Sequence, residues 1–526
     1  MNRRHIVRAA KQRGWMLHPA ALEGIERLLS DDADDLEALF EFVSTHMSGN
    51  TTVTEAIWQQ VADALVKDTR DEVMLPAKNP FPDLEVISAF RTPRLVYRPT
   101  RKQFQVEESR WSLFGEAEDK TNMLERRYYL AQQRILRHEL FRPTDLLHNH
   151  AQAKLTPIES LLGKASTSAV LLLGVLVQVE EGRYYLEDPT GQVPLSLQQA
   201  SVVDEFYVTE HCILLVEGTF HEDTLIVHRL GHPLLEERKE SLAAIRQQLS
   251  HPFYRKASSN TAALGEFVLL SHVELDRPNV LLHLESIFTT FENQSTTTNY
   301  PMFVLMGNFS TTGLSGTKQA LLDLVALIEK FPLLARSAHF CVVPGPGDVA
   351  FSNVLPLQPL KPPPHRIRHL HCTSNPCRII WGGREMVVFN HNILHLLQQR
   401  QLRLPSEIET NERMRLPHCR MVKTILDQGH LCPVAGVPIF WNYDHALQLY
   451  PLPDTLVLGG SDGEHFEEVY GNVDVVHPGS LAHSDSYALY RPSLHRKRLD
   501  DDDDDSMNEE QRVEFFQMGD IKAMKY

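Results

Sequence analysis

Cysteine is scarce in this chain, with six residues in 526, and no two of them have the Cys-x-x-Cys spacing. This spacing is typical of structural zinc sites, so the sequence predicts neither such a site nor any metal cofactor. A large chain with so few cysteines is also unlike a disulfide-stapled secreted domain and fits a reducing compartment. The cysteines stand at positions 212, 341, 372, 377, 419 and 432.

Long apolar runs and an excess of positive charge are also missing. No stretch approaches the ~18 apolar residues of a membrane span, and residues 1–5 lack the apolar core of a signal peptide. We therefore expect a soluble intracellular protein without membrane contact. Lys and Arg total 52 against 68 Asp and Glu, a net charge of −16. A chain of this charge repels polyphosphate overall, so strong non-specific DNA binding is excluded and only local basic patches remain.

The length of 526 residues predicts two to four domains. Residues 1–75 show apolar residues at helical spacing, for example at Leu36, Leu39 and Val43, and predict a helical bundle. Residues 76–166 are expected to be a linker and helical connector. The linker is marked by prolines at 76, 80 and 82, and a helix is expected over 120–140.

A basic stretch within this connector is a candidate nucleic-acid contact. Tyr97 and Phe104 are interleaved with its cations, a mixture that can bind single strands. The alternatives are a solvated strand and turn, or a contact with an acidic partner, and the overall negative charge weighs against DNA. The cations are Arg91, Arg94, Arg98, Arg101 and Lys102.

Residues 167–232 change to short apolar strands, expected at 168–179, 183–188, 192–197, 213–220 and 224–230. Five strands in so short a segment predict an OB-type barrel. Residues 265–492 alternate strands and helices, as in an α/β sandwich, with strands at 267–271, 302–306, 339–343, 386–389 and 455–458. Residues 493–526 are expected to be a disordered acidic tail, because positions 500–505 are six consecutive aspartates.

Five loops of the α/β region read Ser-His-Val-Glu (271–274), Gly-Asn-Phe-Ser-Thr (307–311), Gly-Pro-Gly-Asp (345–348), Gln-Gly-His-Leu (428–431) and Gly-Gly-Ser-Asp (459–462). In their order they resemble the loops of calcineurin-like metallophosphoesterases. The family pattern is Asp-x-His, Gly-Asp-x-x-Asp, Gly-Asn-His-(Asp/Glu), a lone His and Gly-His-x-His. Such loops hold two cations about 3.5–4 Å apart, which need a bridging carboxylate.

Most of these ligand types are missing here. Asn308 replaces the bridging carboxylate, and a neutral amide cannot offset two dications. Only His430 keeps its ligand type and role, so the resemblance implies an inactive site; His272, Glu274 and His430 could still hold an isolated zinc ion. The positions of the degenerate site are His272, Glu274, Asn308, Thr311, Pro346, Gly347, Asp348, His430, Gly460 and Asp462.

Six short motifs occur along the chain: Tyr-Leu-Glu-Asp-Pro-Thr-Gly (185–191), Met-Gly-Asn-Phe (306–309), Val-Pro-Gly-Pro (343–346), Thr-Ser-Asn-Pro-Cys-Arg-Ile (373–379), Gln-Gly-His-Leu (428–431) and His-Pro-Gly-Ser (477–480). In this order they resemble motifs of the second-largest (B) subunits of DNA polymerase epsilon, and the resemblance covers residues 1 to about 492. The resemblance implies a multi-domain α/β protein with a helical domain like the lid of AAA+ ATPases, an OB-fold barrel and an inactive calcineurin-like α/β sandwich.

The resemblance also implies a non-catalytic nuclear scaffold for DNA replication. The expected partners are the catalytic subunit, the small histone-fold subunits of the same complex and, through residues 1–75, the replicative helicase assembly, with DNA contacted weakly or indirectly. Two alternatives remain open: the corresponding subunit of polymerase delta or alpha, and an active phosphoesterase with rearranged ligands.

Overall fold

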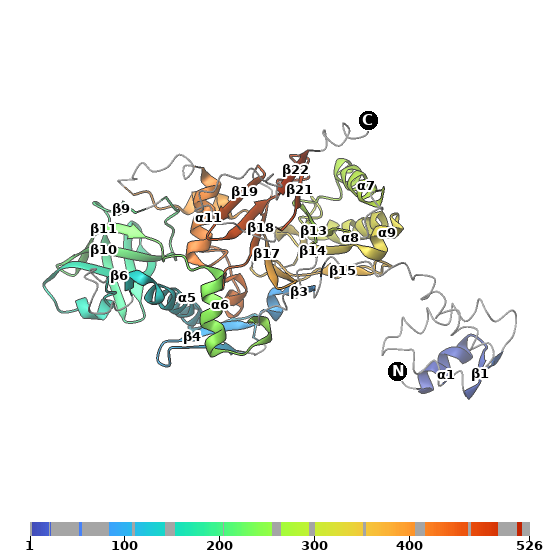
Figure 1. The fold of residues 1–526 in the computed structure, drawn as a ribbon, viewed down its shortest axis with the longest axis horizontal. Coiled ribbons are helices and arrows are strands. Elements are labelled where there is room, and N and C mark those ends of the chain that lie inside the picture. Colours follow the sequence, from blue (N-terminus) through green and yellow to red (C-terminus); the bar gives the residue numbers. More distant parts are fainter. Residues whose placement is uncertain are drawn as a thin grey trace, which may run out of the picture. The chain divides into compact units, whose positions relative to one another are not determined.

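The computed structural model describes residues 3–19, 22, 52–54, 81, 84–107, 111–141, 153–203, 205–254, 265–293, 300–350, 354–404, 416–460, 464–492 and 513–517. The chain divides into two compact units, Met1–Lys78 and Asn79–Tyr526 (Figure 1). In the described part, no helix is both long and apolar enough to cross a membrane.

The first unit contains one described helix, α1 (Arg3–Gln12), and two short parallel strands, β1 (Met16–Leu17) and β2 (Thr52–Val53). Ile6, Ala10 and Val53 are buried and supply its described apolar core. The helical spacing at Leu36, Leu39 and Val43 falls outside the described residues, as do the three prolines expected to mark a linker.

Five strands of the second unit close into a barrel, and all five strands expected in this segment are confirmed. β6 pairs with β7 and β10, β7 with β8, β8 with β11, and β11 with β10, so that the ring has no open edge. The closure buries an apolar interior that includes Leu172, Leu214 and Val227. The barrel strands are β6 (Ser166–Glu180), β7 (Arg183–Asp188), β8 (Gly191–Ser196), β10 (Ile213–His221) and β11 (Thr224–Gly231), with β9 (Ser201–Val202) beside β11.

Two six-stranded sheets form the largest part of the second unit. In order, the first sheet contains β15 (His369–Cys372), β14 (His339–Val343), β13 (Met302–Met306), β12 (Phe267–Leu270), β21 (Ser486–Tyr490) and β22 (Val513–Gln517). The second contains β19 (Phe466–Tyr470), β20 (Val473–His477), β18 (Thr455–Gly459), β17 (Arg384–Asn390), β16 (Cys377–Trp381) and β3 (Glu85–Ser88). The strands expected from the apolar runs of this region are confirmed as β12, β13, β14, β17 and β18.

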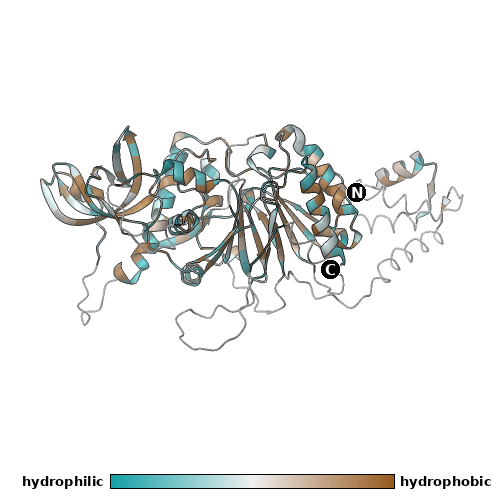
Figure 2. Cartoon of the chain, turned by 90° about the horizontal axis from the view of Figure 1, so that it is seen from above, coloured by the Kyte–Doolittle hydropathy of each residue, from teal (hydrophilic) through white to brown (hydrophobic). Residues whose placement is uncertain are grey.

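The sheets pack face to face, with helices on their outer faces. Side chains of both sheets share one core, in which the rings of Phe267 and Trp381 lie 4.6 Å apart. The first sheet buries its other face against α7 (Pro278–Asn293), α8 (Leu314–Glu329) and α9 (Pro332–Ser337), and the second against α10 (Ile393–Arg400) and α11 (Pro417–Gln428). Figure 2 shows the hydrophobic (brown) residues concentrated on the central strands. The result is a four-layer α/β/β/α sandwich.

A connector made of α5 (Ala117–Arg137), the hairpin β4 (Arg94–Arg98) and β5 (Gln103–Glu107), and α6 (Arg238–Gln248) joins the barrel and the sandwich. The helix expected over 120–140 is confirmed as α5. Two of its four arginines form ion pairs, Arg127 with Asp444 and Arg137 with Glu236, and Arg134 donates to the backbone carbonyl of Asp427. Short 3-10 helices lie at Ala89–Arg91, Glu139–Phe141, Ile158–Leu161, Pro252–Tyr254, Pro346–Asp348 and Trp441–Leu447.

One segment of the expected disordered tail is instead ordered, because β22 pairs antiparallel with β21. Its sequence, Val-Glu-Phe-Phe-Gln, carries apolar residues to both faces of the sheet. Val513 joins the core between the sheets, and Phe516 stacks on Tyr487 with 5.1 Å between ring centroids. Arg491 forms an ion pair with Glu514 across the two strands. The six aspartates at 500–505 lie outside the described residues.

Candidate functional site

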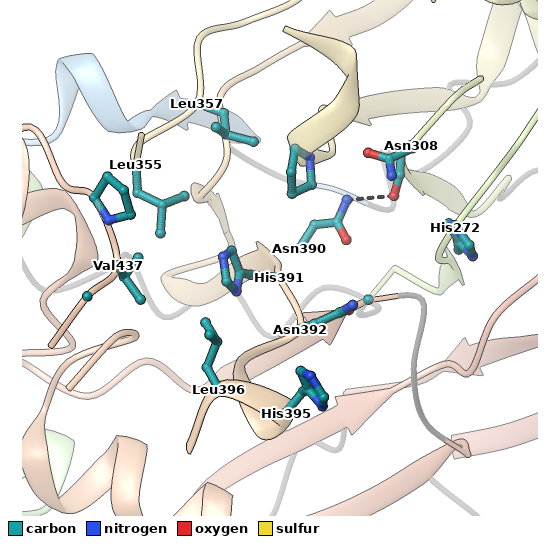
Figure 3. Close-up of a pocket in the computed structure, with 15 residues that line it drawn as sticks. His272, Asn308, Leu355, Leu357, Asn390, His391, Asn392, His395, Leu396 and Val437 are labelled. Atoms are coloured by element: carbon teal, nitrogen blue, oxygen red, sulfur yellow. Dashed lines mark hydrogen bonds between the residues drawn. The ribbon is translucent and has the colours of Figure 1, made fainter. Parts of the chain in front are cut away.

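A pocket of about 530 Å³ lies where loops from both sheets meet, beyond the ends of β12, β13, β17 and β18 (Figure 3). The ends of parallel strands are where open α/β sheets place their ligand sites. Amides and imidazoles line part of it, from His272, Asn308, Asn390, His391, Asn392 and His395. Apolar side chains and prolines line the rest, from Pro346, Leu355, Leu357, Leu396, Val437 and Pro438, together with Gly307, Gly436 and Gly460.

Two asparagines hold the sheets together at this pocket. Asn390 donates from Nδ2 to the carbonyl of Gly307, 2.7 Å away (Figure 3). Asn375 donates from Nδ2 to the carbonyls of Pro344 and Asn390 and accepts from the Asn390 backbone nitrogen. Both side chains are almost fully buried, and their hydrogen bonds span the ends of β13, β14 and β17. The Thr-Ser-Asn-Pro motif therefore has a structural role.

The side-chain oxygen of Asn308, the residue expected at the position of a bridging carboxylate, forms a hydrogen bond within the protein. Oδ1 accepts a hydrogen bond from the backbone nitrogen of Gly347 at 2.8 Å. A Cβ at Gly345 would lie 2.3 Å from this oxygen, so the close approach of the two loops requires glycine there. Because the amide is neutral and already bonded, it cannot bridge two cations.

Asp348 is fully buried and joins two loops rather than lining the pocket. Its carboxylate accepts hydrogen bonds from the backbone nitrogens of Phe309 and Gly345, each at 2.8 Å, and from the Thr317 hydroxyl at 3.2 Å. Burial raises the pKa of Asp348 to about 6, although these hydrogen bonds favour the charged form. The Asp348 carboxylate thus has a structural role in joining the two loops.

The two residues of the first loop that could bind a metal, His272 and Glu274, contact each other, and His272 also contacts a later loop. His272 lies 3.2 Å from Glu274, between Nε2 and Oε1, and its Nδ1 lies 3.1 Å from both Ser480 Oγ and His483 Nδ1. Glu274 also pairs with Arg277. Their polar atoms therefore already have protein partners.

The remaining expected positions are Thr311, Gly460 and Asp462. Thr311 donates its hydroxyl to Asp276 at 2.5 Å. Gly460 lines the pocket, and its nitrogen donates to the Ser271 hydroxyl at 3.0 Å. Asp462 lies outside the described residues.

His430 does not line the pocket. Its Nδ1 accepts from the Cys432 nitrogen at 3.0 Å, and its Nε2 lies 3.1 Å from Asp444, which pairs with Arg127 of α5. Burial lowers the pKa of His430, so it is neutral at pH 7. In the described structure, His272, Glu274 and His430 do not form a group of converging ligand atoms, which removes the geometric basis for an isolated zinc at these three residues.

Three histidines line the pocket instead, His272, His391 and His395, and sequence reasoning missed His391 and His395. His391 directly follows β17, and its ring stacks on Phe389 with 5.6 Å between centroids. Burial lowers its pKa to about 4, so the ring is neutral at pH 7. The available signal was the Phe-Asn-His-Asn sequence at 389–392, directly after an expected strand.

Apart from its histidines, no described lining residue of the pocket has an ionisable side chain. A site for two dications needs carboxylates to offset their charge, and a site for a phosphate substrate needs cationic groups. The pocket as described therefore suits uncharged, hydrogen-bonding groups rather than a dinuclear metal centre.

The basic stretch separates into one buried and four surface cations. Arg94 is 3% exposed; its guanidinium lies 3.2 Å from the Trp111 ring centroid and also bonds to the carbonyl of Asn442. Burial lowers the pKa of Arg94 to about 10. Arg98 pairs with Glu107 at 2.5 Å, and the other exposed cations are Arg91, Arg101 and Lys102.

Arg94 therefore lacks the exposed surface that a phosphate contact would need. The aromatic Phe104 is 3% exposed and packs on Tyr97 at 5.2 Å, which leaves it no free face for a base. Both residues belong to the packing of the connector.

Two protein families match this sequence. The OB-fold domain family of DNA polymerase epsilon subunit 2-like proteins matches residues 117–234, which include the barrel, and the family of DNA polymerase alpha/epsilon B subunits matches residues 267–468. A crystal structure of a Thermus thermophilus protein covers 43% of this chain and 94% of its own with 16% identity, but its TM-score of 0.22 carries no argument about the fold.

Relatives match nearly the whole length of this chain. DNA polymerase epsilon subunit 2 of Bos taurus is 30% identical over 93% of this chain and 97% of its own, and that of Homo sapiens is 30% identical over the same shares. The DNA polymerase epsilon B subunit of Arabidopsis thaliana is 30% identical over 94% of this chain and 98% of its own. Because this similarity extends over both matched domains and almost all of each relative, the chain belongs to the family of DNA polymerase epsilon subunit 2, the B subunit of that polymerase.

Proposed function

We propose that this chain is a non-catalytic accessory subunit of DNA polymerase epsilon that acts in the nucleus as a scaffold during DNA replication. Family membership supports the assignment to this polymerase. The observation that carries the non-catalytic role is the described lining of the pocket, which holds amides and imidazoles but no carboxylate that could bridge two cations and offset their charge. The sandwich is then an inactive relative of the calcineurin-like fold.

The scaffold role assigns different partners to the two units. The barrel and the sandwich would bind the C-terminal region of the catalytic subunit, in one complex with the small histone-fold subunits. The unit Met1–Lys78 would bind the replicative helicase assembly. Its separation from the unit Asn79–Tyr526 supports this division, since separate folding units can carry independent interfaces.

DNA would be contacted weakly or indirectly by this chain. Its net charge is −16, and the basic stretch of the connector has only four surface cations, one of them paired with Glu107. Neutralisation of phosphates by surface Lys and Arg supplies most of non-specific DNA affinity. The scaffold therefore relies on protein partners to reach DNA.

Hydrolysis assays test the non-catalytic assignment. We expect no turnover of bis-p-nitrophenyl phosphate or p-nitrophenyl phosphate with Mn²⁺, Zn²⁺ or Mg²⁺. An active phosphoesterase would instead show metal-dependent hydrolysis that disappears in both His272→Ala and His391→Ala. His365→Ala, which removes an exposed histidine outside the pocket lining, is the matched control for loss of an imidazole.

Copurification tests the assembly. The tagged full-length chain should recover the catalytic subunit of polymerase epsilon from nuclear extract, identified by mass spectrometry. Recovery of the catalytic subunit of polymerase delta or alpha in its place would contradict the proposal. The names of the relatives favour epsilon over these alternatives.

A further inference from the structure

Three side chains with metal-ligand chemistry meet away from the pocket, where the first turn of α11 packs on β19. His418 and Cys419 are the second and third residues of α11, and Glu468 lies at the centre of β19. One ligand atom from each lies within 4.8 Å of the other two. Among the residues that the structure describes, no other group of three or more His, Cys, Asp or Glu side chains brings its ligand atoms this close together.

The contacts within this cluster all involve one carboxylate oxygen. Cys419 Sγ lies 2.9 Å from Glu468 Oε1, and His418 Nε2 lies 3.7 Å from the same atom. The His418 ring stacks on Phe466, with centroids 4.7 Å apart and an interplanar angle of 14°. This stacking orients the imidazole, so the three ligand atoms are held together by the packing of α11 on β19.

We propose that His418, Cys419 and Glu468 form a binding site for one zinc ion, with a water molecule as the fourth ligand. Zinc binds sulfur at about 2.3 Å and nitrogen or oxygen at about 2.0–2.2 Å, so the ligand atoms of one tetrahedral ion lie roughly 3–4 Å apart. The cluster has nearly this spacing before any ion is bound. A thiolate together with an imidazole selects zinc over Mg²⁺ and Ca²⁺, which prefer oxygen ligands.

The exposure of the three side chains provides a path for the ion. Cys419 is buried, at 5% exposure, whereas the side chains of His418 and Glu468 are 27% and 11% exposed. The site is thus open on the side of the histidine and closed beneath the thiol. The open side gives the ion access and leaves room for the fourth ligand, and the buried sulfur is screened from bulk solvent.

The ion would stabilise a helix that contacts the barrel at its other end. Gln428, the last residue of α11, bonds the backbone nitrogen and carbonyl of Ile213 in β10 through its side-chain amide, at 2.8 Å each. Lys423 and Tyr470 already connect the middle of α11 to β19. Zinc at the first turn would fix the start of α11 to β19. The ion would thereby help to hold the barrel in place relative to the sandwich.

Metal analysis of the untagged full-length chain tests the proposal. After loading with ZnSO₄ and dialysis against metal-free buffer, we expect one zinc per chain by inductively coupled plasma mass spectrometry. Substitution by Co²⁺ should produce a thiolate-to-cobalt charge-transfer band in the near ultraviolet. Cys419→Ser should abolish this band and weaken zinc binding at least tenfold, and Glu468→Gln should weaken binding by a similar factor.

Two further variants separate ligand loss from misfolding. His418→Ala removes a partly exposed side chain, so a folded protein that has lost the zinc is expected, with circular dichroism unchanged. Cys372→Ser, at a half-buried cysteine of β15, should keep both the zinc and the cobalt band. The proposal is overturned if the loaded wild-type chain holds less than a tenth of an equivalent of zinc, or if His418→Ala and Cys419→Ser retain the wild-type stoichiometry.

Discussion

Arg127 of α5 and Asp444 of the 3-10 helix Trp441–Leu447 form a buried, two-pronged ion pair, 317 residues apart in sequence. The side chains are 8% and 2% exposed. His430 also contacts Asp444. Burial alone would raise the pKa of the Asp444 carboxyl, but the charge of Arg127 and the contact with His430 together outweigh burial, so the pKa lies below its usual value. The pair connects α5 to the sandwich, and His430 belongs to this buried cluster and not to the pocket lining.

The first prediction concerns this pair. Asp444→Asn should lower the free energy of unfolding by about 3–5 kcal/mol, because it leaves the buried Arg127 charge without a counter-charge. The exposed cross-strand pair of Arg229 and Glu217 in the barrel is the control. Arg229→Ala should cost no more than about 1 kcal/mol. Chemical denaturation of both variants measures the difference, and equal costs would contradict a special role for the buried pair.

The second prediction is a loss of stability in mild acid. Burial lowers the pKa of His477 to about 4, and it lowers the pKa values of His445 and His391 to about 4 as well. Between their unfolded pKa, near 6.5, and about 4, the unfolded chain binds more protons than the folded one, so stability falls as the pH falls. From pH 6.5 to 5 each such histidine contributes about 2 kcal/mol.

His477→Asn tests this dependence. The Asn Oδ1 can replace His477 Nδ1 as the acceptor for the Gly479 nitrogen, a bond of 3.1 Å. Denaturation at pH 7 and pH 5 should therefore show a smaller acid effect in the variant than in the wild type, by about 2 kcal/mol. An unchanged pH dependence would show that His477 does not titrate as we expect. His395→Ala is the control for histidine removal at the surface.

The third prediction concerns Asp348. Asp348→Asn replaces one acceptor oxygen with a donor, so a backbone nitrogen of Phe309 or Gly345 loses its partner. We expect a loss of stability of about 1–3 kcal/mol, from the cost of a buried unsatisfied group. Copurification with the catalytic subunit should be unchanged at a temperature where the variant is folded. A variant as stable as the wild type would contradict the structural role.

The fourth prediction concerns the unit Met1–Lys78. Deletion of residues 1–78 should leave binding to the catalytic subunit intact and weaken attachment to the helicase assembly, because the core of the unit Asn79–Tyr526 does not depend on it. Pull-downs of the truncated and full-length chains measure both contacts. If the truncated chain keeps the helicase contact and loses the catalytic subunit, the proposed roles of the two units are reversed.

Local sequence predicted much of the secondary structure. Apolar runs such as residues 302–306 and 339–343 are strands because parallel strands buried on both faces need apolar residues throughout. The five barrel strands were equally visible from alternation and turns. The tail was predicted less well. The expectation of disorder depended on the six aspartates and missed the short apolar strand Val513–Gln517.

The sequence by itself determined the family resemblance, because this depends on residue identity and order along the chain, and on the same basis it predicts the loss of metal-ligand types. The tertiary structure decided which residues meet. It placed His391 rather than His430 at the pocket, buried Arg94 against Trp111, and brought Glu468 to His418 and Cys419. These contacts follow from the order of strands within the sheets and from helix packing, which join segments tens to hundreds of residues apart, and no local spacing encodes them.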